Sequence, residues 1–203
     1  MAKGYWIVRL EVSEPERYKD YVALTNAALA KFGGRFLVRG GPFERLEGEA
    51  RSRNVVVEFA DYETALACWH SPDYQAAYAI RAPISSGEHV VVEGYDGPQA
   101  ADTPPSRPGA AYWIMRIDVH DPETYKSYIE ADAIASAIYR PWFLVRGGRH
   151  IAVQGVGRAR NVLVAFPDYE TALACYNSPE YQRALGFRLK AADAEVLVIH
   201  GVQ

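Results

Sequence analysis

The feature that most constrains this chain is an internal repeat. A constant offset of 107 residues aligns residues 5–96 with residues 112–203 without a gap, and about 42 of the 92 aligned positions are identical. One run, Asp61–Cys68, returns unchanged as Asp168–Cys175. Each copy is large enough to form a small domain, and two copies are too few for a solenoid. The chain is therefore one domain written twice.

The segment between the copies, residues 98–110, is rich in proline. Its four prolines disfavour a helix and a central strand alike. Extended at about 3.1 Å per residue, it spans roughly 40 Å, which is enough to carry the chain from one copy to the next. We therefore predict a first unit over residues 1–97, a linker over residues 98–110 and a second unit over residues 111–203.

The composition is that of a soluble globular protein, with 49% hydrophobic residues, 23% charged residues and a net charge of −3. No basic run favours a nucleic-acid partner. No apolar stretch approaches the roughly 20 residues that a membrane helix needs, and the N-terminus lacks the apolar core of a signal peptide. We expect a cytoplasmic protein with neither a nucleic-acid nor a membrane partner.

The hydrophobic pattern of one copy predicts alternating strands and helices. Tyr5–Val12 alternates as a strand does, and Ser13-Glu14-Pro15-Glu16 fits a helix start with Ser13 as the N-cap. The remaining predicted elements follow in order along the first copy: a helix to about residue 32, strands at 35–38 and 53–59, helices at 63–69 and from 72, and a strand at 88–95. This β-α-β-β-α-β order predicts a ferredoxin-like unit with a four-stranded antiparallel sheet and helices on one face.

The second face of that sheet carries Tyr5 and Ile7, which are too apolar to remain in water. A second sheet packed against it would remove the exposure, and the other copy supplies one. We therefore predict an α+β fold in which two ferredoxin-like βαββαβ units pack sheet to sheet as an intramolecular pseudo-dimer. Unpaired outer edges leave a further homo-oligomer open.

Several segments resemble the DUF1330 family: Gly4–Ile7, Gly33–Gly41, Arg53–Phe59 and Ser71–Gln75. The resemblance covers both copies nearly end to end. It implies membership of the dimeric α/β-barrel superfamily, whose members include cofactor-independent monooxygenases, muconolactone isomerases and haem-binding chlorite dismutase-like proteins. It also implies a small-molecule pocket, but it names no reaction, because the family has no general activity and a fold does not determine one.

Arg39 and Arg146 lie in identical Phe-Leu-Val-Arg-Gly-Gly segments. A guanidinium beside glycine backbone could bind a substrate carboxylate or enolate through two parallel hydrogen bonds. The alternative is an ion pair between the units, with Glu58 or Glu93 as the acid.

Arg53-Asn54 and Arg160-Asn161 open the third strand of each copy. The asparagine amides could donate to a developing oxyanion, and we count all four residues as candidate substrate-binding residues. The alternative is that the asparagines complete backbone hydrogen bonds at a strand edge.

His70 follows the second helix and is the candidate general base near neutral pH, although the other copy has Asn177 there. The alternative is a residue that interacts with the free carbonyls at a helix end. Trp6 and Trp113 are expected between sheet and helices, where they would line a pocket.

The cysteines and the other histidines give no sign of a metal. Cys68 and Cys175 occupy matching helical positions, where a cysteine is typically a small buried residue. The remaining histidines form no ligand cluster, so we expect neither a metal nor a cofactor.

The leading interpretation is a small-molecule-binding protein that acts, as a metal-independent enzyme, on a small organic acid or an aromatic compound. One alternative is a non-catalytic binding or assembly module with vestigial pockets. Another is a cofactor-independent monooxygenase-like enzyme, which would require a base such as His70.

Overall fold

The computed structural model describes residues 2–106 and 108–202 of the chain. Their contacts form two units, and each unit combines most of one repeat with a short segment of the other. Unit 1 takes Gly148–Gly157 from the second repeat, and unit 2 takes Pro42–Ala50 from the first. The two repeats therefore exchange one segment each.

The elements of each unit follow the predicted order, with one added strand from the exchanged segment. In unit 1 they are β1 (Gly4–Val12), α1 (Pro15–Lys31), β2 (Arg35–Arg39), β4 (Arg53–Phe59), α2 (Tyr62–His70), α3 (Pro72–Arg81), the 3-10 turn η1 (Ala82–Ile84), β5 (Ser85–Glu93) and β8 (His150–Gln154). In unit 2 they are β3 (Phe43–Glu47), β6 (Ala111–Val119), α4 (Pro122–Tyr139), β7 (Trp142–Arg146), β9 (Arg160–Phe166), α5 (Tyr169–Asn177), α6 (Pro179–Ala191) and β10 (Ala192–His200).

Each unit has a five-stranded antiparallel sheet, with the order β2-β4-β1-β5-β8 in unit 1 and β7-β9-β6-β10-β3 in unit 2. The fifth strand is the exchanged one: β8 pairs with β5, and β3 pairs with β10. The prediction of four strands was therefore one short. Phe43–Glu47 is a short, mostly polar segment whose partner strand lies in the other repeat, so no pairing within one copy reveals it.

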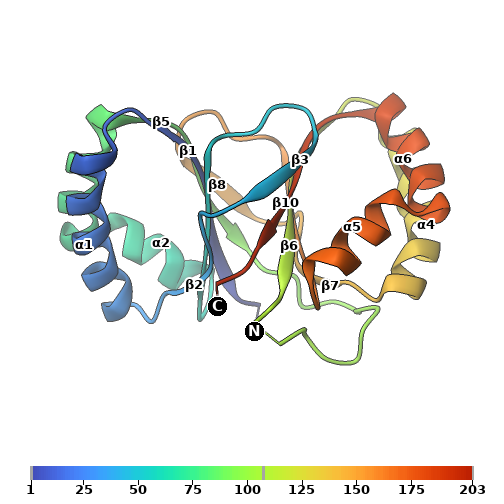
Figure 1. Ribbon diagram of the computed structural model, residues 1–203, viewed down its shortest axis with the longest axis horizontal. Coiled ribbons are helices and arrows are strands. Elements are labelled where there is room, and N and C mark those ends of the chain that lie inside the picture. The colour runs from blue at the N-terminus through green and yellow to red at the C-terminus, as the bar shows by residue number, and fades with distance from the viewer. Residues whose placement is uncertain (1, 107, 203) are drawn as a thin grey trace. The chain divides into compact units, whose positions relative to one another are not determined.

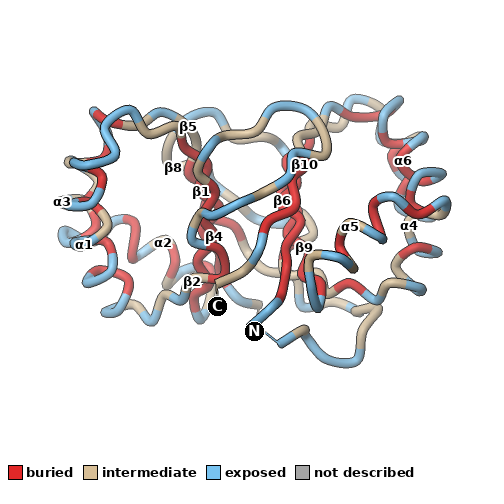
Figure 2. Tube along the Cα trace, in the orientation of Figure 1, coloured by how far each residue is buried: buried red, intermediate tan, exposed pale blue. Residues whose placement is uncertain are grey.

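The helices of each unit cover one face of its own sheet (Figure 1). In unit 1, the alternate residues Trp6, Val8 and Leu10 of β1 form a core with the buried faces of α1, α2 and α3. The equivalent strand of unit 2, β6, does the same with α4, α5 and α6. Figure 2 shows the central strands buried along most of their length and the helices buried on one side only. The predicted α+β, pseudo-dimeric ferredoxin-like fold is confirmed.

The other side of β1 is buried as well, since Tyr5 and Ile7 are 2% and 1% exposed. The packing of one sheet on the other stays a prediction. Among the described helices, none combines the length and the apolar character that crossing a bilayer requires.

The start of α1 differs from the predicted capping box. The helix begins at Pro15, its N-cap residue is Glu14, and no side chain caps it. Ser13 Oγ instead donates to the carbonyl oxygen of Ile84 at 3.0 Å, in the turn before β5. The prediction of Ser13 as the N-cap was wrong, because a tertiary partner outcompetes the local one.

The linker binds the edge of the sheet in unit 2. The Gln99 side chain donates to the carbonyl oxygen of Phe143 and accepts from its backbone N–H, both at 2.8 Å. Arg140 adopts a left-handed conformation with φ 48° at the end of α4, and its side chain bonds Asp102 at 2.7 Å. The linker contacts therefore protect an edge strand and hold a strained residue in place.

Each exchanged strand is followed by a glycine, and substituting that glycine tests how closely the chain approaches the neighbouring strand there. Gly48 and Gly155 have φ 62° and 72°, and a Cβ at either would lie 2.4 Å from a backbone oxygen. Gly33 has φ 64° but nothing within 4 Å of its Cβ position. We expect Gly33→Ala to cost about 1 kcal/mol of unfolding free energy, from backbone strain alone. Gly48→Ala and Gly155→Ala should each cost about 2 kcal/mol more. Urea unfolding measures all three, and equal losses would contradict the close approach.

Candidate functional site

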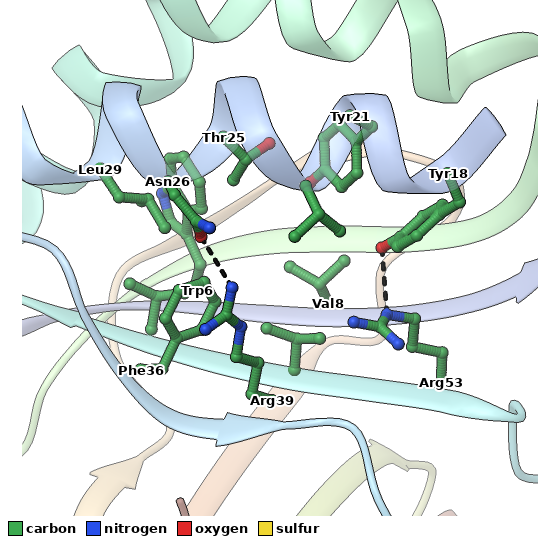
Figure 3. A pocket seen from close by; sticks show the side chains of 13 residues that line it. Trp6, Val8, Tyr18, Tyr21, Thr25, Asn26, Leu29, Phe36, Arg39 and Arg53 are labelled. Atoms are coloured by element: carbon green, nitrogen blue, oxygen red, sulfur yellow. Dashed lines mark hydrogen bonds between the residues drawn. The ribbon is translucent and has the colours of Figure 1, made fainter. Parts of the chain in front are cut away.

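A small cavity lies in unit 1 between α1 and the strands β1, β2 and β4 (Figure 3). Its floor is apolar and includes Trp6 and Phe36, and its mouth carries Arg39 and Arg53. Its volume is about 30 Å³, enough for one or two water molecules. A larger ligand would therefore require side chains at the mouth to move.

An open groove of about 480 Å³ adjoins the cavity and shares Tyr18, Val22 and Arg53 with it. Lys19 also lines the groove and adds positive charge. That volume is in the range of small-molecule sites. Movement of Tyr18 and Arg53 would join the groove to the cavity.

Arg39 is held at the mouth by neutral partners. Its Nη2 donates to Asn26 Oδ1 at 2.9 Å, and its guanidinium carbon lies 4.6 Å from the centre of the Phe36 ring. Glu58, which we considered as its partner, instead pairs with Arg35 at 2.6 Å. Arg39 therefore keeps its capacity to bind an anion.

Arg53, like Arg39, is held by a neutral partner. Its Nε donates to the Tyr18 hydroxyl at 3.2 Å, and its guanidinium lies over the Tyr18 ring. Burial raises the pKa of Tyr18 to about 12, so the hydroxyl stays neutral at physiological pH. Within the described residues, neither Arg39 nor Arg53 forms an ion pair.

The other candidates from the first repeat lie at different places. Trp6 lies in the cavity floor, and its indole N–H donates to the carbonyl oxygen of Ala65 at 2.9 Å. Asn54 is fully buried, points to the opposite face of β4 from Arg53, and donates to the carbonyl oxygen of Arg51. His70 is exposed at the end of α2 and lines neither cavity.

Unit 2 has an equivalent cavity of about 40 Å³, lined among others by Trp113, Arg146 and Arg160. Arg160 Nη2 donates to the carbonyl oxygen of Arg146 at 3.2 Å. Pro141 stands where the first repeat has the smaller Gly34. It lines the cavity of unit 2 and does not fill it. Asn161, like Asn54, is fully buried and lies outside the lining.

Asp132 is a residue of this second cavity that the sequence analysis missed. Burial raises the pKa of its carboxyl, against the opposing effects of the Ser136 hydrogen bond and of the charges on Arg146 and Arg188. A carboxyl group with a raised pKa in a cavity is typical of a general acid or base. The first repeat has Thr25 at this position, so attention to identical residues alone overlooks it. Its helical spacing from Tyr125 and Tyr128, on the buried face of α4, was the sequence pattern that could have identified it.

Two fully buried arginines were also missed, Arg81 in the last turn of α3 and Arg188 in the last turn of α6. Arg188 pairs with Glu47 of β3, at 2.6 Å and 3.0 Å. Arg81 lies over the rings of Tyr21 and Tyr78. Their spacing on the buried faces of the helices was the available signal, since charged residues at such positions are rare unless paired.

His89 is another buried polar residue of unit 1. Its ring centre lies 4.6 Å from that of Trp6 and 4.7 Å from that of Trp69. Burial, together with the positive charge of Arg81, lowers its pKa well below the ordinary value. The imidazole is therefore neutral in the folded protein.

The described residues contain no group of three or more histidine, cysteine or acidic side chains that could hold a metal ion. Cys68 and Cys175 are buried, and burial raises the pKa of each thiol to about 12. Both are therefore protonated and poor nucleophiles.

The model of the domain of unknown function DUF1330 matches residues 3–95 and 110–202, which are the two repeats. A search of curated proteins finds no match.

Comparison with solved structures shows the same fold at low sequence identity. A candidate chlorite dismutase has a TM-score of 0.59 and 11% identity, over 100% of this chain and 96% of its own. An anthrone oxidase-like protein has 0.55 and 10%, over 99% and 92%. A candidate monooxygenase from Fusobacterium nucleatum has 0.55 and 11%, over 100% and 92%. These likenesses concern the fold.

The neutral state of His89 predicts a pH dependence of stability. Below about pH 6.5 the unfolded chain protonates this histidine and the folded chain does not, so stability falls by up to about 1.4 kcal/mol per pH unit. Above about pH 7 the effect vanishes. We expect His89→Val, which introduces the equivalent residue Val196, to remove this part of the slope in urea unfolding between pH 5 and 8. The exposed His70→Asn is the control and should retain it; equal slopes for wild type and His89→Val would contradict the assignment.

Proposed function

The chain belongs to the DUF1330 family, and since that family has no known function, we propose from the cavities that this protein binds a small organic acid or aromatic anion in unit 1. One observation carries the proposal. Arg39 and Arg53 stand at the mouth of an apolar cavity with only neutral partners, and no acidic residue lines that cavity.

The chemistry of the mouth suits a carboxylate. A carboxylate placed between the two guanidiniums would replace the Asn26 amide and the Tyr18 hydroxyl as acceptors. Hydrogen bonds to a charged acceptor are stronger than those to a neutral one. The exchange is therefore favourable for both arginines.

The floor of the cavity suits an apolar or aromatic body. Trp6 and Phe36 contribute aromatic rings to the lining, and Val8 contributes an aliphatic side chain. The small volume implies that the ligand enters from the adjoining groove as Tyr18 and Arg53 move. The binding energy must then exceed the cost of breaking the 3.2 Å hydrogen bond between Arg53 and Tyr18.

A second candidate function concerns unit 2, where Asp132 places a carboxyl group inside the cavity. A carboxylate there repels an anionic ligand and favours a hydroxyl or phenol that can donate a proton to it. Trp113 adds a buried indole N–H that has no hydrogen-bond partner among the described residues. Proton transfer is therefore the chemistry that unit 2 supports, with Asp132 rather than His70 as the base.

Arginine substitutions test acid binding in unit 1. We expect Arg39→Ala and Arg53→Ala each to weaken benzoate binding by about 10- to 100-fold, since each removes a charge-assisted hydrogen bond. Isothermal titration calorimetry measures the affinity. Arg35→Ala is the control, because it removes the same charge from β2, the strand of Arg39, but its partner is Glu58. An equal loss in the control, or no binding of any small acid by wild type, would refute the proposal.

A swap between the repeats tests the difference between the cavities. Asp132→Thr introduces the residue of the first repeat and removes the carboxylate from the second cavity. We expect the calorimetric stoichiometry for benzoate to rise from one to two per chain. Glu130→Thr, on the exposed side of the same helix, should leave it at one. A stoichiometry that stays at one in Asp132→Thr would show that Asp132 does not set the difference.

A further inference from the structure

The two buried arginines occupy equivalent places in the two units. Arg81 and Arg188 are separated by the repeat offset, and neither has any exposed surface. The guanidinium carbon of each lies 5.2 Å from the ring centre of an equivalent tyrosine, Tyr21 in unit 1 and Tyr128 in unit 2. The two sites can therefore be compared group by group.

In unit 2 the chain neutralises its own arginine. Arg188 donates two hydrogen bonds to Glu47, at 2.6 Å and 3.0 Å, and a third to the Tyr181 hydroxyl at 3.2 Å. The Tyr176 hydroxyl donates to the same carboxylate at 3.0 Å. Glu47 comes from the exchanged strand β3, so the exchange places a carboxylate on a fully buried cation.

In unit 1 that carboxylate is missing from the sequence. Gln154 stands at the position of Glu47, and Trp69 at that of Tyr176. The Tyr74 hydroxyl, equivalent to the acceptor Tyr181, pairs with the Tyr21 hydroxyl at 3.1 Å instead. Among the described residues, none of the three Arg81 nitrogens has a hydrogen-bond partner, and neither has Gln154 Oε1.

One more residue is polar in this part of unit 1 but apolar at the equivalent position of unit 2. His89 replaces Val196 of the second repeat and lies opposite Gln154 in the pairing of β5 with β8. It is fully buried, and neither ring nitrogen has a hydrogen-bond partner among the described residues. A neutral imidazole has one N–H to donate, and the Gln154 amide can donate once its two ends are interchanged.

We propose that Arg81, with His89 and Gln154, forms a buried site for a small monovalent anion, chloride or the carboxylate group of a small acid such as formate. A buried guanidinium without a counter-ion is strongly unfavourable, and water supplies hydrogen bonds but no charge. The Glu47 carboxylate on Arg188 is the model for the bound group. One guanidinium balances one negative charge, which favours a monovalent anion over phosphate. The site is separate from the cavity mouth, and the inference does not rest on the function proposed above.

Reciprocal exchange of the two equivalent residues tests the site. The thermal unfolding temperature is measured against sodium formate and sodium chloride, with ionic strength held constant by sodium gluconate, whose anion is too bulky to enter. Wild type should show a saturable rise of about 5 to 10 °C at about 100 times the dissociation constant. Gln154→Glu should unfold at a higher temperature without formate and should lose the formate response. Glu47→Gln should unfold at a lower temperature and should gain a second saturable response.

Two results would overturn the proposal: no specific anion response in wild type, or an undiminished response in Gln154→Glu. Should a variant fail to fold, wild-type crystals soaked in bromide give an independent answer. An anomalous peak within hydrogen-bond distance of the Arg81 guanidinium supports the site, and peaks confined to the surface refute it. Benzoate affinity in Gln154→Glu should equal that of wild type, so failure of this site and failure of acid binding at the mouth are distinguishable.

Discussion

The pairing of β8 with β5, and of β3 with β10, is the constraint on which the rest of the structure depends. Each ladder joins residues of different repeats, so each sheet is completed by a strand from outside its own copy. The same exchange delivers side chains: Glu47 reaches Arg188, and Arg149, just before β8, reaches Glu63 of α2 at 2.6 Å. A sequence change in an exchanged segment of one repeat therefore alters the interior of the unit that is built mainly from the other repeat.

Duplication within one chain allows the two interiors to diverge, since each position can change in one copy alone. A homodimer would place the same residue at both equivalent sites. Here two arginines line each cavity, but the second cavity also has the carboxyl group of Asp132 where the first has Thr25. Glu47 and Gln154 similarly give one buried arginine an internal counter-ion and the other none. In both of these pairs one polar residue replaces another.

The sequence predicted the framework well because local periodicity and repetition determine it. The alternation through Trp6 and the exact repeat of Asp61–Cys68 were sufficient to predict the units and their order of elements. The exchanged strand was not predictable, since Phe43–Glu47 acquires its partner only across the repeats. Arg81 and Asp132 escaped attention for a related reason: their significance comes from burial and from what the equivalent position lacks. Arg39 and Arg53, by contrast, could be singled out from their repeated motifs, and the structure places both at one cavity mouth.

The exchange of strands also bears on where this chain could be divided. Cutting within residues 98–110 would yield two fragments, each lacking the fifth strand of its own sheet and carrying the strand that the other requires. Each fragment would expose an open edge on β5 or β10 and would carry a strand, β3 or β8, with no sheet to join. The fragments would thus behave as complementary halves that reconstitute one protein by strand donation, and neither could be treated as an autonomous domain for expression or transfer to another chain.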